Sequence, residues 1–362
     1  MKRQFMAGLI WLVPSFGTRV VYDDNVFHRP AAEADMSVRF SPRLDAFRNT
    51  KRLALSGTAE LDADRFARHD ELTTAHAGEL ATFDVTYSAS RRLSMSNAAA
   101  FMETETPADL NELTALTPGR ARARRLMLHP SAIYDLGPRA SATVGYLVTA
   151  DSLSGGTSTT TQTMSVSLDR HFSAREGVRL EYLEQHFFFD ANRTSASRTL
   201  TAAWTREIDR GTMLTLRAGP RITAGVLAAE LTASARHALR SGSVTVSYQQ
   251  TQTTLIGLEG IARMRSLTAG AERDLGRGVR LQTTSAVVDT RQAAVPTRAY
   301  RLSGGFVWKP APALSLETSY DSDLQHGNLY AYAAQATQII RRNAVTMKLT
   351  VARPATATTS GR

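Results

Sequence analysis

The sequence contains no cysteine among its 362 residues. Disulfide bonds, zinc sites with cysteine ligands and thiol nucleophiles are therefore excluded. A second absence concerns long hydrophobic runs, since no window of eighteen or more residues is apolar throughout. The sequence therefore predicts no transmembrane helix.

Lysine is scarce as well. Of the 43 basic residues, only Lys2, Lys51, Lys309 and Lys348 are lysine, and the formal net charge is +10. A basic total is compatible with nucleic-acid binding. The arginines, however, are scattered along the chain and do not gather in one helix or patch. We therefore predict no nucleic-acid partner and ascribe the arginine excess to the base composition of the genome.

Patterns typical of catalysis and metal binding are missing too. The eight histidines fall in different predicted strands and loops, and no pair has metal-ligand spacing. No glycine-rich phosphate loop or serine-centred elbow occurs. Asp23, Asp24 and Asn25 are adjacent oxygen donors, but neighbouring residues of a strand point to opposite faces. The sequence predicts no catalytic residue, no metal site and no cofactor.

Alternation of apolar and polar residues is the pattern that the sequence does have. In the stretch 230–254, Leu231 is followed by Thr232 and Thr245 by Val246, with a tight turn between the two runs. A period of two indicates extended strands, and two such runs with a short turn indicate an antiparallel hairpin. The pattern recurs to give about eighteen strands of roughly nine to thirteen residues, the length that a tilted strand needs to cross a bilayer. Sixteen strands is the alternative count.

The connections between the predicted strands alternate between short and long. Alternation of this kind is typical of outer-membrane barrels, which have short periplasmic turns and longer outer loops. The short turns lie near Ser90, Gly137, Ala174, Gly211, Gly242, Gly276 and Pro310, and the longer loops lie near Arg68, Leu113, Gly156, Arg193, Gly257, Ala294 and Gly327. Both termini are expected on the side of the short turns.

Aromatic residues make up only 7% of the chain, yet five of them recur at one position of the pattern. Each lies on the apolar face just before a short turn, where an interfacial aromatic girdle would be expected. These girdle candidates are Tyr87, Tyr134, Phe172, Trp204 and Trp308.

These observations predict an all-β fold, a single closed antiparallel transmembrane β-barrel. A soluble β-sandwich or β-solenoid would share the period of two, but a sheet this long would leave open edges that closure removes. We expect Leu231, Val244, Val246, Val144 and Leu316 to point outward to lipid, and Thr232, Thr245, Thr143 and Glu317 to point to the lumen.

Three regions are expected along the chain. Residues 1–17 have the charged and then apolar layout of a secretory signal but lack a clean cleavage site. They are either a degenerate signal or internal sequence downstream of the true start. Residues 18–352 form the barrel, and residues 353–362 form a polar tail.

Charged residues of both signs lie on the polar face of the predicted strands. One account is a ladder of cross-strand charge pairs that fills and stiffens the lumen, and the other is a polar path for a hydrophilic, anionic solute. The lumen-facing candidates are Arg39, Arg43, Glu60, Asp62, Asp84, Asp169, Arg179, Glu181, Arg217, Glu230, Arg236, Arg301 and Glu317.

Several stretches resemble a family of outer-membrane β-barrel porins that occur with exopolysaccharide and exosortase gene clusters. The stretches are 22–27 (YDDNVF), 106–111 (TPADLN), 218–221 (AGPR) and 248–258 (YQQTQTTLIGL), and the resemblance runs in order from about residue 18 to residue 351. It implies one barrel in the outer membrane of a Gram-negative bacterium, in contact with outer-membrane lipid and with polysaccharide or export machinery. The family brings no catalytic residues, and the last strand lacks the terminal aromatic that many barrels have.

Three function classes remain open. A channel or secretion component for a hydrophilic solute or exopolysaccharide is the first, a structural or docking barrel with a filled lumen is the second, and a barrel-wall hydrolase is the third. We predict that the chain is not an enzyme. The longest loop, 104–123, is acidic at its start and basic at its end. A long barrel loop either stays outside as a mobile surface or folds inward and narrows the pore, and the hypothesis for this loop is that part of 109–118 lies at or inside the barrel mouth.

Overall fold

The architecture comes from a computed structural model of the chain. It describes residues 10–111, 113–114, 116, 119–190, 193–292, 295–330 and 338–352. Residues 1–9 and the expected polar tail 353–362 lie outside the described residues. Within those ranges, no helix is long and apolar enough to cross a membrane.

Eighteen strands make up most of the described chain, with two single-turn 3₁₀-helices in the connections. The strands are β1 (Trp11–Asp23), β2 (Asp35–Asn49), β3 (Leu53–Phe66), β4 (Thr74–Ser88), β5 (Leu93–Thr104), β6 (Ala123–Gly137), β7 (Ala140–Leu153), β8 (Thr159–Ser173), β9 (Glu176–Phe189), β10 (Thr194–Glu207), β11 (Thr212–Thr223), β12 (Val226–Leu239), β13 (Gly242–Thr254), β14 (Ile261–Gly276), β15 (Val279–Gln292), β16 (Val295–Ala311), β17 (Leu314–His326) and β18 (Ile339–Ala352), and the 3₁₀-helices are η2 (Asp70–Leu72) and η3 (Pro107–Asp109).

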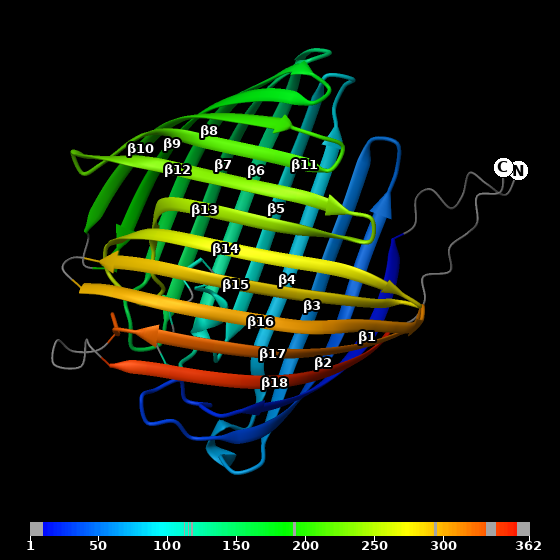
Figure 1. The fold of residues 1–362 in the computed structure, drawn as a ribbon, viewed down its shortest axis with the longest axis vertical. Coiled ribbons are helices and arrows are strands. Elements are labelled where there is room, and N and C mark those ends of the chain that lie inside the picture. The colour runs from blue at the N-terminus through cyan, green and yellow to red at the C-terminus, as the bar shows by residue number, and fades with distance from the viewer. Residues whose placement is uncertain are drawn as a thin grey trace, which may run out of the picture.

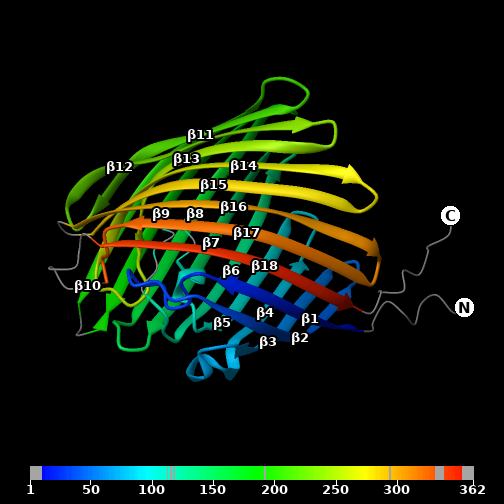
Figure 2. The same ribbon diagram turned by 60° about the horizontal axis from the view of Figure 1, so that its bottom comes forward.

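The sheet closes on itself. Every strand pairs antiparallel with its neighbours in sequence, and β1 also pairs with β18, from Ser15 opposite Ala352 to Asp23 opposite Ala344. The strands follow one another around a single barrel (Figure 1), and the first and last strands lie side by side where the ring closes (Figure 2). The predicted closed antiparallel barrel of eighteen strands is confirmed, and the alternative of sixteen is not.

The alternation of side chains decides which face is which. Directly paired residues share a face, so the register carries the assignment from strand to strand around the barrel. Leu231 and Val246 are exposed on the outside of β12 and β13, whereas Thr232 and Thr245 face inward and are half-buried. The strands are 12 to 17 residues long, longer than the sequence pattern predicts, because pairing continues beyond the apolar band toward both rims.

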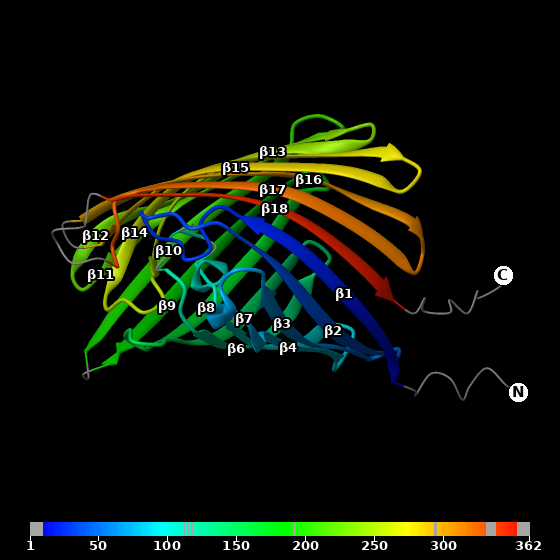
Figure 3. The ribbon, with the colours of Figure 1, turned by 90° about the horizontal axis from the view of Figure 1, so that it is seen from below.

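The two ends of the barrel differ. β1 begins and β18 ends at the end that carries the short turns (Figures 1 and 3). At the opposite end lie the long connections 24–34, 105–122, 255–260 and 327–338. We refer to the first as the turn end and to the second as the loop end.

The alternation of short and long connections is not strict, which corrects the sequence expectation at two places. Only two residues separate Thr223 from Val226, and only two separate Gln292 from Val295, where a longer loop was expected near Ala294. In the first hairpin, Ala224 and Gly225 have φ values of 47° and 80°. Two consecutive left-handed residues form the tight turn whose twist matches the flanking strands, so no longer loop is needed there.

The first strand starts earlier than the alternation at Thr18 indicates. β1 begins at Trp11, and Trp11 pairs with Phe47 of β2. The last three residues of the apolar run Phe5 to Val13, which resembles a signal segment, therefore form part of the barrel wall.

Candidate functional site

The lumen wall brings together the charged residues of the polar face. Arg39 lies opposite Asp64, and Arg43 lies opposite Glu60, so these residues share the inner face. Following the register around the ring gives the same result for every one of the thirteen candidates. The structure places on the lumen side Arg39, Arg43, Glu60, Asp62, Asp84, Asp169, Arg179, Glu181, Arg217, Glu230, Arg236, Arg301 and Glu317.

A chain of ion pairs crosses four adjacent strands near the loop end. The Arg301 Nε lies 2.8 Å from Asp323 Oδ1, and the Arg342 Nη1 lies 3.6 Å from Asp323 Oδ2. Arg342 also contacts Asp23, with 2.8 Å between its Nε and Oδ2. Because each carboxylate has a cation beside it, this part of the wall presents alternating charges without an excess of either sign.

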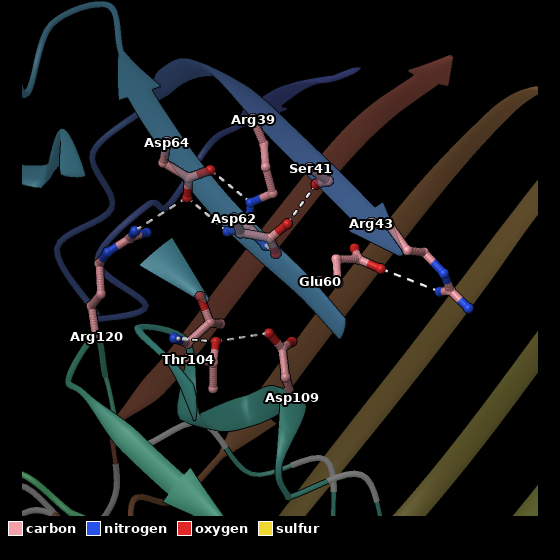
Figure 4. Close-up of polar contacts among 10 residues, drawn as sticks. Arg39, Ser41, Arg43, Glu60, Asp62, Asp64, Thr104, Asp109 and Arg120 are labelled. Carbon is pink, nitrogen blue, oxygen red and sulfur yellow. Dashed lines mark hydrogen bonds and ion pairs between the residues drawn. The ribbon is translucent and has the colours of Figure 1, made fainter. Parts of the chain in front are cut away.

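The chain of charges continues on β2 and β3. Arg39 contacts Asp64 at 2.6 Å and Asp62 at 3.1 Å, and the Ser41 hydroxyl donates to Asp62 at 2.5 Å. Arg120, from the connection between β5 and β6, reaches the same Asp64 at 3.8 Å (Figure 4). A residue of a loop therefore contacts the inner face of the wall, which places that loop inside the barrel.

Two further groups of charges lie elsewhere in the lumen. Arg43 contacts Asp45 at 2.8 Å and Glu60 at 3.2 Å. On the far wall, Arg217 approaches Glu181 at 2.5 Å, and both line a cavity of about 230 Å³ together with Arg179. Sequence reasoning omitted Asp45 and Asp64, although each lies on the inner face by its spacing of two from a residue that was recognised.

The remaining charged candidates differ in how closely they approach a residue of opposite charge. Arg221 and Glu230 form a buried pair at 2.8 Å, and Arg236 lies 3.6 Å from Glu272. Glu317 lies directly opposite Lys348 in the sheet. Charges along most of the lumen thus have a neighbour of opposite sign, as a ladder that stiffens the wall requires.

The described residues of the connection 105–122, which we call the inner segment, fold into the barrel mouth. Leu116 is fully buried and packs with Leu255 and with the inward side chains of Met264 and Val288. Leu110 forms a second buried cluster with Ile256 and Ala123. The hypothesis that part of 109–118 lies at or inside the mouth is confirmed for the described residues of that range, and Glu112, Ala115, Thr117 and Pro118 lie outside the described residues.

Asn111 ties the inner segment to two other loops. Its side-chain amide donates to the Leu116 carbonyl at 3.3 Å and to the Tyr330 hydroxyl at 3.0 Å, and its Oδ1 accepts from the Ile256 N–H at 3.3 Å. The Tyr330 hydroxyl in turn donates to the Ile256 carbonyl at 2.9 Å. Burial raises the pKa of Tyr330, so the hydroxyl keeps its proton and remains a donor.

No pattern in the sequence brings residues 111, 256 and 330 together, because they lie in three loops far apart in the chain. The sequence therefore does not predict this network of hydrogen bonds. The only available signal was the length of the inner segment, which predicts its place but not its partners.

The side chains of Asp23, Asp24 and Asn25 hold the connection 24–34 against the rim of the barrel at β18. Asp24 accepts from the Asn343 backbone N–H at 2.6 Å and from its side-chain amide at 2.7 Å, while Asp23 contacts Arg342. The Asn25 amide donates to the Arg341 carbonyl at 2.8 Å. Over the described ranges, no three His, Asp or Glu side chains are grouped as a metal site would require.

Comparison with solved structures finds similar barrels over almost the whole chain. Pseudomonas aeruginosa OccK5 (OpdH) has a TM-score of 0.52 at 11% identity, with 94% of this chain and 98% of that chain covered. Acinetobacter baumannii OccAB4 has a TM-score of 0.51 at 9% identity, with 96% and 100% covered, and Pseudomonas aeruginosa OpdQ has 0.50 at 10%, with 95% and 98% covered. No family model and no curated protein matches the sequence.

The fold is a closed 18-stranded antiparallel β-barrel, as in these outer-membrane barrels. At identities near one tenth the likeness concerns the fold alone. The inner segment of this porin-like barrel and the charged wall that it faces form the candidate functional site.

The aromatic candidates lie on the outside of the porin-like barrel at its turn end. Tyr87 lies opposite Leu53 and one residue before the end of β4, and Tyr134 lies opposite Leu93 and three residues before the end of β6. The indole of Trp204 donates to Glu176 at 2.8 Å. The five aromatic residues are Tyr87, Tyr134, Phe172, Trp204 and Trp308.

Proposed function

We propose that this barrel lies in the outer membrane and passes hydrophilic solutes through a lumen that the inner segment narrows. The contact between Arg120 and Asp64 is the observation that carries the proposal. It sets a segment of the chain against a charged wall, where it reduces the cross-section but leaves polar groups beside the path. A barrel of this size has an interior wide enough for an aqueous channel unless something fills it.

Uncharged, hydroxyl-rich solutes such as saccharides suit this lumen best. The ion pairs near the loop end leave no strong excess of one sign to select an anion or a cation. Between them, the wall is rich in hydroxyl groups, such as those of Thr143, Thr201, Thr232 and Thr245, which both donate and accept hydrogen bonds as sugar hydroxyls do. The resemblance to porins of exopolysaccharide gene clusters agrees with such a solute, and polysaccharide secretion is the specific role that we propose.

A barrel with a filled lumen is the second candidate. Buried apolar side chains at the mouth, Leu116, Leu255 and Ile256 among them, favour it because they pack three loops together over the opening. In that case the barrel would serve as a rigid support or docking point and would pass no solute.

Swelling of vesicles in iso-osmotic sugar solutions separates the two candidates. We expect vesicles that contain the purified protein to swell with small sugars and progressively less with larger ones. Thr232→Trp adds a bulky side chain on the lumen side and should slow swelling, whereas Leu231→Trp, its neighbour on the lipid side, should not. Vesicles that do not swell with any sugar would overturn the channel and support the filled barrel.

A further inference from the structure

Four arginines lie together on the outer face of β14, β15 and β16, close to the loop end. Arg263 and Arg265 follow the start of β14, Arg291 precedes the end of β15, and Arg298 lies near the start of β16. All four side chains are exposed on the outer face. The residues that alternate with them point to the lumen side, and one of these, Met264, is buried beneath the inner segment. The usual order of the faces is thus inverted at this part of the rim, with charge outside and apolar side chains inside.

The cluster carries an excess of positive charge. Arg263 lies directly opposite Arg291, and Arg265 lies opposite Asp289. The Asp289 carboxylate, however, contacts Arg298 at 2.5 Å. In the part of the chain that the structure describes, no carboxylate pairs with Arg263, Arg265 or Arg291. Like charges directly opposite one another destabilise a sheet, so the arrangement calls for an anion between them.

Two other outward arginines near the loop end have partners. Arg124 on β6 contacts Glu103 of β5, and Arg198 on β10 contacts Glu184 of β9 at 3.2 Å. These pairs neutralise their own charge on the same outer surface. The cluster on β14–β16 differs from these two pairs because Arg263 lies opposite another arginine, Arg291.

A cavity of about 960 Å³ borders all four arginines. Its lining also includes apolar and aromatic side chains of the outer face, Leu227, Pro296 and Tyr300. Toward the middle of the strands, the outer face continues as Leu267, Val287 and Leu302. The cluster thus lies at the edge of the apolar band, at the depth of lipid headgroups, and the cavity has the size of a small-molecule site rather than that of a single ion.

We propose that Arg263, Arg265, Arg291 and Arg298 bind the phosphate groups of a phosphorylated glycolipid in the outer leaflet. This inference rests on the proposed place of the barrel in the outer membrane, whose outer leaflet carries such lipids at the loop end. A guanidinium offers two parallel N–H donors to a phosphate, and one phosphate between Arg263 and Arg291 removes their mutual repulsion. The apolar side chains beside the cavity contact the sugar backbone and the first part of the acyl chains.

The test is a binding titration of the purified full-length protein in detergent with a bisphosphorylated lipid A. Arg263→Gln combined with Arg291→Gln should weaken binding at least about tenfold, because two charge-assisted hydrogen-bonding groups are lost. The matched control combines Arg124→Gln with Arg198→Gln, which removes two outward arginines from the same rim, and should keep the affinity within about twofold. The dephosphorylated lipid should bind weakly to all three proteins.

Equal binding by the wild-type protein and the Arg263/Arg291 variant would overturn the proposal. Equal affinity for the dephosphorylated lipid or for phosphatidylglycerol, or displacement of the lipid by inorganic phosphate alone, would overturn it as well. Sugar-dependent swelling in vesicles of phosphatidylcholine, which lack the glycolipid, should be the same for the variant and the wild type. A failure of the channel proposal therefore appears in the swelling assay, and a failure of the lipid site appears in the titration.

Discussion

At the scale of single residues, neighbours in one strand meet different surroundings in this barrel. Thr245 faces the lumen, and Val246, near the middle of β13, faces outward. Arginine in place of Val246 should cost roughly 2–4 kcal/mol of unfolding free energy, because its charge would lie in the hydrocarbon layer, and arginine in place of Thr245 should cost much less. Urea unfolding of the two variants in vesicles measures the difference, and equal costs would show that the faces are wrongly assigned.

A second residue-scale prediction concerns His28 in the connection 24–34. Burial, followed by the charges of Arg342, Arg120 and Arg301, lowers the pKa of this imidazole well below 6.5. The ring is therefore neutral while the loop is packed, and it regains an ordinary pKa near 6.5 if the loop leaves. The stabilisation of the packed loop is present above about pH 6.5 and is lost as the pH falls toward the lowered pKa, by roughly 1.4 kcal/mol per pH unit.

Channel conductance measured between pH 7.5 and 5.5 tests this linkage. We expect conductance to rise as the pH falls in the wild-type protein, because a loosened loop leaves the mouth more open. His28→Gln should remove most of that rise. His171→Gln, at an exposed histidine near the turn end, should keep it. An unchanged rise in the His28 variant would show that other groups cause it.

At the scale of elements, the inner segment is held by a few specific contacts. Asn111→Ala removes the acceptor of the Ile256 N–H and one donor to the Tyr330 hydroxyl, which leaves buried polar groups without partners. The local cost should be about 1–3 kcal/mol, so the Ile256 amide should exchange its hydrogen roughly ten- to a hundredfold faster. Hydrogen exchange followed by mass spectrometry measures this, with Asn97→Ala on the outer face of β5 as the control. Identical exchange in both variants would mean that Asn111 is not the anchor.

The sequence predicts the strands and the faces of most of them, but it does not predict what covers the inner face near the loop end. The period of two locates the strands and their faces, because lipid and water act on every residue of the wall in turn. Near Arg263 and Met264 the alternation continues, but the polar residue points outward and the apolar residue points to the lumen side. The reason is that the inner segment, rather than water, covers the inner face there. Alternation alone does not report what covers a face, so the sequence does not predict the arginine cluster.

At the scale of the whole molecule, closure explains why so alanine-rich a sheet holds together. Each strand has a partner on both sides, and β1 completes the ring with β18 despite the absence of a terminal aromatic. The number of strands, and the end of the barrel at which β1 begins and β18 ends, could be predicted because both follow from counting alternating segments. The contacts that narrow the lumen could not, because Leu116, Leu255 and Tyr330 meet only once the ring is closed.

Single-channel conductance in planar bilayers tests the central claim most directly, with residues 109–118 replaced by a short glycine–serine linker. The wild-type protein should show small, discrete conductance steps, and the replacement should increase them several-fold while the barrel stays folded. The matched control replaces Asp70–Leu72, which lie in a loop at the same end without reaching the lumen clusters, and should conduct as the wild type does. Conductance that is absent from all three proteins, or equal in the wild type and the 109–118 replacement, would contradict the account of a channel narrowed by its own inner segment.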